Sequence, residues 1–169
     1  AKEEADIVMV FLHTGVEYQN EPDEATKERV EYLADLGVDV VIGTHPHVIR
    51  PYGMMERPDG KQMLVYYSLG NFVSGQQGIS QLLEGMADMT FVKDPDTGEI
   101  SIETYSMEPL VMHYEPGYSG YAVYPLEKYT EELAAASGVH QETNEDFSPE
   151  SIQAYFEPYL KPQVFERSE

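Results

Sequence analysis

The sequence predicts an α/β fold in which parallel strands are followed by an antiparallel meander. Residues 6–12 and 38–42 are short, β-rich apolar runs, the pattern of parallel strands that are buried on both faces. Residues 23–36 lie between them and have helical periodicity, which predicts a strand, helix, strand unit with a right-handed crossover. Further along, two β-rich runs flank the turn-rich residues 94–98, as in a hairpin.

The elements of the first half follow from local signals. The strand over residues 6–12 ends at His13. The helix over residues 23–36 has acidic residues in its first turn and Gly37 just beyond its end, where a left-handed residue closes many helices. After the strand over residues 38–42, the apolar residues 63–68 predict a third strand, and a turn follows it.

The second half is expected to pack on the first. The hairpin strands are predicted at residues 86–93 and 99–107, and the stretch 112–124, rich in Tyr, Gly and Pro, is expected to run irregularly over the surface. We divide the chain into a core, residues 1–112, and a C-terminal appendage, residues 113–169, which is not an independent domain.

The appendage is predicted to be largely helical. One helix is expected over residues 126–136, with Gly138 ending it. A second opens at Ser148 with Pro149 in its first turn, and Pro158 should end or kink it. The two histidines of this region, His113 and His140, are expected at the surface.

Composition and charge exclude several classes of function. Ten Lys and Arg against 31 Asp and Glu give a formal net charge of -21, which repels nucleic acid and anionic membrane surfaces. The same charge opposes a polyanionic substrate unless bound cations reverse the potential locally. Because the 169 residues include no cysteine, disulfides, thiolate zinc sites and cysteine nucleophiles are excluded, and any metal must use nitrogen and oxygen ligands.

Two histidine-bearing turns are the main functional signal. His13 ends one predicted parallel strand, and His45-Pro46-His47 follows the next. The carboxyl ends of parallel strands share one edge of a sheet, so the three imidazoles should converge there and bind a metal. The alternative is a loop whose histidines cap backbone groups or lie exposed.

Four more residues are candidates for substrate contact. Glu17 and Tyr18 share the turn of His13, where a carboxylate can bind metal, accept a hydrogen bond from an imidazole, or simply be solvated. Asn71 follows the third strand, and a structural role in its loop is favoured over a role in the site. Arg50 can hold an anionic group or pair with a carboxylate, and pairing is favoured. The catalytic residues themselves are not identified, beyond Glu17 as a candidate.

Three ordered motifs carry a resemblance to a known family. His-Thr-Gly-Val-Glu-Tyr at residues 13–18, Gly-Thr-His-Pro-His-Val at 43–48 and Tyr-Ser-Leu-Gly-Asn-Phe at 67–72 resemble the bacterial capsule synthesis family CapA, or PGA_cap, which is related to calcineurin-like metallophosphoesterases. The resemblance covers about residues 1–110 and extends to residues 121–126 and the helix after them. Thr14 departs from it, since many relatives have an aromatic residue there.

This resemblance implies a metal centre and its ligands. The fold would be the C-terminal half of a metallophosphatase-like α-β-β-α sandwich. His13, His45 and His47 would be ligands of one or two divalent ions, Zn, Mn or Fe. The Gly-Asp strand end and the Asn-Asn-His turn of the family, which supply the other ligands, do not occur in this sequence. We therefore expect an N-terminal half of the same domain to complete the site, and this chain alone to be inactive.

The resemblance also leaves two functions open. The first is a metal-dependent hydrolase or transferase in capsule, or poly-γ-glutamate, biosynthesis, acting on an amide or a phosphate ester. The second is a non-catalytic cell-surface protein that binds or tethers the anionic capsule polymer or its precursor. Either would be extracytoplasmic and anchored to the membrane through a preceding N-terminal segment. An independent domain is disfavoured, because the edge of the sheet would be left unpaired.

Overall fold

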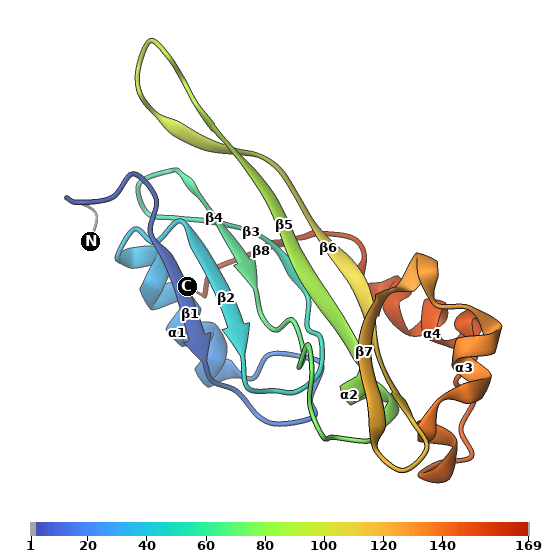
Figure 1. The fold of residues 1–169 in the computed structure, drawn as a ribbon. Coiled ribbons are helices and arrows are strands. Elements are labelled where there is room, and N and C mark those ends of the chain that lie inside the picture. Colours follow the sequence, from blue (N-terminus) through green and yellow to red (C-terminus); the bar gives the residue numbers. More distant parts are fainter. Residues whose placement is uncertain (1–2, 169) are drawn as a thin grey trace.

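The computed structural model describes residues 3–168 and shows a mixed α/β fold built on two sheets (Figure 1). This confirms the predicted fold class. The first sheet has the strand order β1-β2-β4-β3-β8. Its strands are β1 (Met9–His13), β2 (Val40–Thr44), β3 (Tyr52–Glu56), β4 (Gln62–Tyr66) and β8 (Gln163–Phe165).

The parallel part of this sheet agrees with the sequence. β1 pairs in parallel with β2, and β2 with β4, so the carboxyl ends of all three strands lie at one edge. The connection from β1 to β2 is the helix α1 (Glu24–Asp35). The Asp23 side chain accepts the Thr26 backbone N–H as its N-cap, and Gly37 adopts a φ of 76° beyond its end.

Two strands of the first sheet were not expected. β3 forms an antiparallel hairpin with β4, and β8, near the C-terminus, pairs in parallel with β3. At Gly53 the two backbones are so close that a Cβ atom would lie 1.9 Å from the Gln163 carbonyl oxygen. Residues 163–165 are thereby fixed to the first sheet.

The second sheet is the predicted meander, and it is longer than expected. Its strands are β5 (Leu83–Lys93), β6 (Ile100–Glu115) and β7 (Ser119–Pro125), all antiparallel. The expectation that residues 112–124 are irregular is therefore wrong, because most of them pair in β6 and β7. The surface position expected for His113 is also wrong: its side chain is buried, and its Nδ1 lies 2.9 Å from the Tyr129 hydroxyl. His140 is exposed, as expected.

The layers are α1, the first sheet and the second sheet, with the hairpin of β5 and β6 extending well beyond the first sheet (Figure 1). Val30 and Ala34 of α1 pack on one face of the first sheet. The opposite face packs against β5 and β6, and includes the stacked rings of Tyr52 and Tyr66, whose centroids are 5.1 Å apart.

The second sheet covers one face of the first sheet but does not reach β1. Phe11 is 70% exposed, although its register partner Ile42 on β2 is buried. The expectation that this strand is buried on both faces is therefore wrong for the face that carries Met9 and Phe11, since β1 is an edge strand beyond the reach of β5 and β6.

The C-terminal helices pack against β6 and β7 around a second apolar core that includes Tyr129, Phe147 and Phe156. The helix predicted at residues 126–136 is interrupted: a 3₁₀ turn precedes Thr130, whose side chain caps the following helix. The last helix agrees with prediction, with Ser148 as N-cap. The helices are α2 (Ile79–Leu82), η1 (Leu126–Lys128), α3 (Glu131–Ala136), η2 (Gly138–Gln141), α4 (Pro149–Phe156) and η3 (Glu157–Tyr159). Within residues 3–168, none of the helices has the length and apolar character needed to span a bilayer.

Candidate metal centre

The histidine turns meet at the carboxyl edge of β1, β2 and β4, as the sequence predicts. The rings of His13 and His45 have centroids 4.7 Å apart, and those of His45 and His47 are 5.9 Å apart. Parallel pairing of β1 and β2 brings His13 opposite Thr44, whose hydroxyl oxygen lies 3.1 Å from His13 Nδ1. The sheet therefore places three imidazoles together although about thirty residues separate the first from the others.

The backbone of these turns adopts unusual conformations. His45 has a φ of 98° and His47 a φ of 61°, and Tyr18 and Phe72 in the neighbouring loops have φ values of 62° and 65°. Non-glycine residues seldom adopt positive φ, at a cost of about 1–3 kcal/mol each, and such residues cluster at functional sites. In an extended segment His45 and His47 would point to opposite sides. Here the left-handed residues bring both rings to the same site.

Glu17 joins two of these histidines in a possible ligand group. Glu17, His45 and His47 each offer a ligand atom, and these atoms all lie within 4.8 Å of one another. Glu17 Oε1 is 3.9 Å from His47 Nε2. Two imidazole nitrogens and a carboxylate oxygen suit Zn, Mn or Fe, so the donor set fits the expected ions. His13 lies beside this group, next to His45.

Asn71 fixes the orientation of His47. The Asn71 amide donates from Nδ2 to the Gln81 backbone carbonyl at 3.2 Å and to Gln76 Oε1 at 2.9 Å. A carbonyl can only accept, so Asn71 Oδ1 must face His47 Nδ1, 2.7 Å away, and Nδ1 must carry the proton. The lone pair then lies on His47 Nε2, the atom that faces Glu17. Asn71 thus has a structural role in its loop and also orients the His47 ring.

Arg50 supports the loop that carries Glu17 and Tyr18. Its side chain is completely buried, and it donates from Nε to the Gln19 carbonyl at 2.8 Å and from Nη2 to the Val16 carbonyl at 3.0 Å. The favoured pairing with a carboxylate is also present, at the limit of ion-pair contact: Arg50 Nη1 lies 4.0 Å from Asp23 Oδ2. Arg50 therefore acts on the backbone of this loop and is not accessible to a substrate.

Glu84 on β5 lies next to the loop of Asn71 and is a residue that the sequence did not single out. Its side chain is completely buried beside Gly70, and neither carboxylate oxygen makes a hydrogen bond. Burial raises the pKa of Glu84 to about 8, although the nearby Phe72 backbone amide acts in the opposite direction. Glu84 is therefore a protonated, neutral side chain at neutral pH.

Sequence reasoning also missed Gln76, which connects two candidates. It accepts from Asn71 and donates from Nε2 to the Tyr18 hydroxyl at 3.0 Å. The Tyr18 ring lies beside His47, with centroids 6.0 Å apart. The available signal was the Gly-Gln-Gln-Gly sequence at residues 75–78, two residues after the third motif ends.

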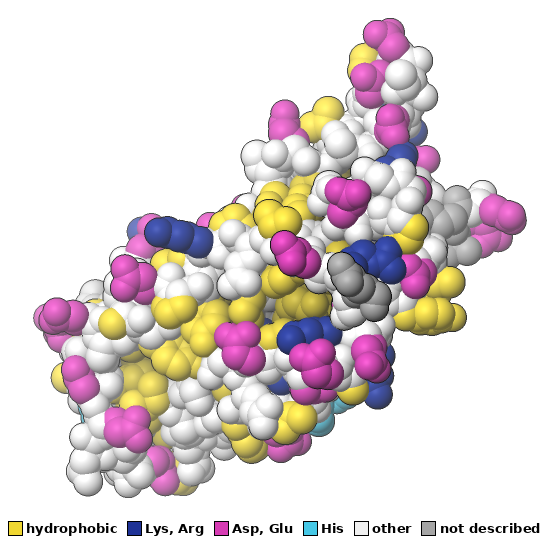
Figure 2. Space-filling model, turned by 180° about the vertical axis from the view of Figure 1, so that it is seen from behind, with side chains coloured by type: hydrophobic (Ala, Val, Ile, Leu, Met, Phe, Trp, Pro, Cys, Tyr) yellow, Lys and Arg dark blue, Asp and Glu magenta, His cyan; other side chains and the backbone are white. Residues whose placement is uncertain are grey.

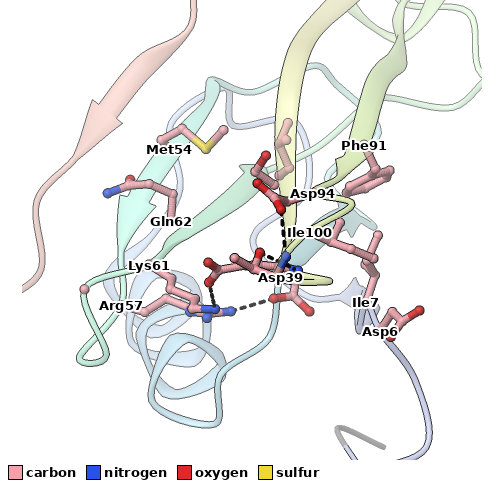
Figure 3. A pocket seen from close by; sticks show the side chains of 15 residues that line it. Asp6, Ile7, Asp39, Met54, Arg57, Lys61, Gln62, Phe91, Asp94 and Ile100 are labelled. Atoms are coloured by element: carbon pink, nitrogen blue, oxygen red, sulfur yellow. Dashed lines mark hydrogen bonds and ion pairs between the residues drawn. The ribbon is translucent and has the colours of Figure 1, made fainter.

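A separate pocket lies toward the end of the first sheet that is opposite to the histidines (Figure 3). The residues just before β1 and just before β2 line one side of it, and the β5–β6 hairpin lines the other. Its cationic side chains already have acidic partners. Arg57 forms ion pairs with Asp39 and Asp59, and Lys61 pairs with Glu99. The Lys61–Glu99 pair joins the β5–β6 hairpin to the first sheet, and the Arg57 pairs join segments of the first sheet to one another, so we assign this pocket a structural role.

Comparisons with known proteins point to one family. The family described as bacterial capsule synthesis protein PGA_cap matches residues 1–76, which include all the residues of the histidine turns and Asn71. The chain is 35% identical over 102 residues to the PGA biosynthesis protein CapA of Bacillus subtilis (strain 168), covering 60% of this chain and 25% of that protein. It is 39% identical over 75 residues to the capsule biosynthesis protein CapA of Bacillus anthracis, covering 44% of this chain and 17% of that protein. The chain thus spans a quarter or less of these curated relatives. No solved structure matches it significantly.

Proposed function

We propose, from the match of residues 1–76 to the bacterial capsule synthesis protein PGA_cap family, that this chain belongs to that family. We further propose that it carries the histidine side of a divalent-metal site in a protein of poly-γ-glutamate capsule biosynthesis. The observation that carries the proposal is the group of Glu17, His45 and His47, whose ligand atoms lie within 4.8 Å of one another. The reaction would be metal-dependent hydrolysis or group transfer. Zn, Mn or Fe bound there would supply a Lewis acid and an activated water.

The residues of the chain have distinct parts in this proposal. His45 and His47 would bind the ion, with Glu17 as an oxygen ligand and His13 available next to His45. Asn71 holds the proton on His47 Nδ1, so that Nε2 remains free to bind. Further oxygen ligands would come from the part of the relatives that this chain does not span, which we propose as the N-terminal half of the same domain.

Charge also supports a role for bound metal. Figure 2 shows acidic side chains spread over the face that it displays, with few Lys and Arg side chains. A protein with a formal charge of -21 repels an anionic polymer, and a divalent ion would offset this repulsion where the polymer meets the site. We propose that the full-length protein works outside the cytoplasm, at the cell surface, where such a polymer is assembled or attached.

Metal analysis of variants tests the proposal. We expect the purified chain to bind Zn²⁺ stoichiometrically, and His45→Ala with His47→Ala to remove this binding. His140→Ala is the matched control, because His140 is exposed and lies on the helical side of the molecule. Absence of saturable Zn²⁺ binding in the unchanged chain would contradict the proposal.

The same variants separate catalysis from tethering in cells. The equivalent histidine substitutions in the full-length protein should abolish polymer attachment if the metal site acts in the reaction. Attachment that survives them would instead support the non-catalytic tethering function. The exposed side chains of Tyr18 and Phe72, 52% and 60% exposed beside the histidines, are a contact surface that such a function would use.

A further inference from the structure

Three tyrosine rings lie together at the turn between β6 and β7, at the end of the second sheet that is opposite to the β5–β6 hairpin (Figure 1). Tyr114 is on β6, Tyr118 is in the turn, and Tyr121 is on β7. The Tyr114 ring is stacked against both others, with centroids 5.8 Å apart in each case and planes inclined by 22° and 26°. The three rings therefore form a ladder of roughly parallel planes.

The two outer members of this ladder are open to solvent. Tyr114, which contacts both other rings, is 1% exposed, whereas Tyr118 is 47% and Tyr121 41% exposed. Single exposed apolar side chains are common on protein surfaces, but here two large rings are exposed side by side on a shared buried ring. Aromatic side chains presented in this way are enriched at binding surfaces, because they offer a large contact area together with a polar tip.

The turn that presents Tyr118 is fixed before any ligand binds. Tyr118 has a φ of 58°, and Gly117 and Gly120 on either side of it have φ values of 79° and 61°. Positive φ in a residue other than glycine costs about 1–3 kcal/mol and is frequent at functional sites. From the C-terminal appendage, Gln141 Oε1 accepts the Gly117 N–H at 3.2 Å, and Glu142 Oε1 accepts the hydroxyl of Tyr118. The appendage thus holds the turn and its ring in one arrangement.

Polar groups with unused hydrogen-bonding capacity stand at the same place. Burial, the Glu142 carboxylate and the hydroxyls of Tyr118 and Tyr121 raise the pKa of Tyr114 to about 12, so the polar ends of the three rings gather around this carboxylate. Within the described residues, the Tyr114 hydroxyl has no hydrogen-bond partner. A carboxylate accepts several hydrogen bonds, and the Nε2 group of Gln141 carries two donors beside its bonded Oε1. Acceptors and donors therefore flank the open rings.

We propose that the exposed rings of Tyr118 and Tyr121 bind the pyranose rings of a neutral oligosaccharide. The C–H groups on the face of a pyranose carry a slight positive charge and pack against the negative face of an aromatic ring. The hydroxyl groups of a sugar both donate and accept hydrogen bonds, which matches the amide of Gln141 and the carboxylate of Glu142. Because two rings are open, the site suits a chain of sugars and not a single one.

This sugar site is separate from the proposed metal centre. It lies on β6, β7 and the appendage, outside residues 1–76, which match the PGA_cap family. It involves none of the histidines or loops of the metal centre. A sugar chain bound there would fix the protein to a glycan while leaving the histidine turns unoccupied.

Charge and ring geometry favour a neutral sugar over charged ligands. Glu115 and Glu142 lie at this turn, in a protein with a formal charge of -21, so an anionic ligand would be repelled. An organic cation would be attracted, but aromatic sites for such cations enclose them with several ring faces. The nearly parallel rings of the ladder form no such enclosure, and instead present flat faces.

Titration with a defined sugar tests the proposal. Amide ¹H–¹⁵N spectra of the 169-residue chain would be recorded during addition of chitotriose, a neutral β-linked trisaccharide of N-acetylglucosamine. We expect saturable shifts confined to residues 114–121 and 138–142, with an affinity weakened about two- to tenfold by Tyr118→Ala and by Tyr121→Ala, as for loss of one aromatic contact. Tyr121→Phe keeps the ring and should bind within about twofold of the unchanged chain. Tyr32→Ala is the matched control, because Tyr32 is an exposed tyrosine on α1.

Three results would contradict the sugar site. Shifts that are absent, or affinities that are equal in Tyr118→Ala, Tyr121→Ala and Tyr32→Ala, would show that the rings serve only to pack the turn. Equal affinity for the monosaccharide N-acetylglucosamine would contradict binding of a sugar chain. Tighter binding of tetramethylammonium, weakened by the same two substitutions, would assign the rings to a cation. None of these titrations involves Zn²⁺, so their outcome leaves the proposed metal centre to its own test.

Discussion

Replacing Glu84 by Gln should stabilise the protein, and the gain should grow as the pH rises. Glu84 is completely buried, and neither of its carboxylate oxygens has a hydrogen-bond partner. Its pKa is raised from 4.5 to about 8 because burial disfavours the charged form. Glutamine has nearly the same shape and carries no ionisable group, so the substitution removes the cost of keeping this carboxyl protonated.

The size of the effect follows from the two pKa values. Below pH 4.5 the carboxyl is protonated in both the folded and the unfolded protein, so it adds no penalty. Between pH 4.5 and about 8 the unfolded protein loses the proton while the folded protein keeps it, so the stability falls as the pH rises. At about 1.4 kcal/mol per pH unit, the penalty is about 3 kcal/mol at pH 7 and approaches 5 kcal/mol above pH 8.

Urea unfolding at pH 5, 7 and 8.5 checks this prediction. The difference in free energy of unfolding between Glu84→Gln and the unchanged protein should be small at pH 5 and increase toward pH 8.5. Glu103→Gln, at an exposed position on the neighbouring strand β6, should show no such trend. A difference for Glu84→Gln that stays constant with pH would refute the reasoning, because it would mean that the carboxyl does not titrate differently on folding.

Two substitutions near the histidine turns have equally specific outcomes. Asn71→Ala should weaken Zn²⁺ binding about 10- to 100-fold, because His47 loses the acceptor that orients it, and calorimetry should show unchanged affinity for the exposed control Asn144→Ala. Gly43→Ala should destabilise the protein by about 3 kcal/mol in urea unfolding, because its Cβ would lie 2.1 Å from the Tyr67 carbonyl oxygen. An affinity for Asn71→Ala within twofold of the unchanged chain, or an unaltered unfolding midpoint for Gly43→Ala, would contradict the respective contact.

The convergence of the histidine turns was predictable because it depends on topology. Two apolar runs joined by a helix predict parallel strands, and parallel strands end at the same edge of a sheet. The helix signals were also local, such as the Asp23 cap and Gly37 after α1. Periodicity and capping therefore sufficed to predict the order β1, α1, β2 and the parallel pairing of the two strands.

Features that depend on long-range packing were not predictable in the same way. The exposure of Phe11 depends on where the second sheet ends, and β8 is a strand only because it pairs with β3, far away in sequence. The prediction for residues 112–124 is wrong because Tyr, Gly and Pro suggest irregular structure, whereas antiparallel pairing between β6 and β7 decides their conformation.

The candidate metal centre likewise combines residues that the sequence predicts with conformations that depend on long-range contacts. The sequence indicated His13, His45 and His47, but not the positive φ values of His45 and His47 that bring their side chains together. Those conformations are imposed by contacts between loops, such as the bond from the Tyr18 N–H to the Pro46 carbonyl. The link from Asn71 through Gln76 to Tyr18 likewise requires loops from different parts of the chain to be adjacent.

The most direct test of the metal centre is the ¹⁵N spectrum of the histidine side chains during Zn²⁺ addition. Without metal, His47 should show a protonated Nδ1 and an unprotonated Nε2, as its bond to Asn71 requires. On addition of Zn²⁺, the Nε2 resonance of His47 and one ring nitrogen of His45 should shift together and saturate, while His140 stays unchanged. Shifts that are absent, or that are equal at His140 and at His45 and His47, would contradict the metal centre.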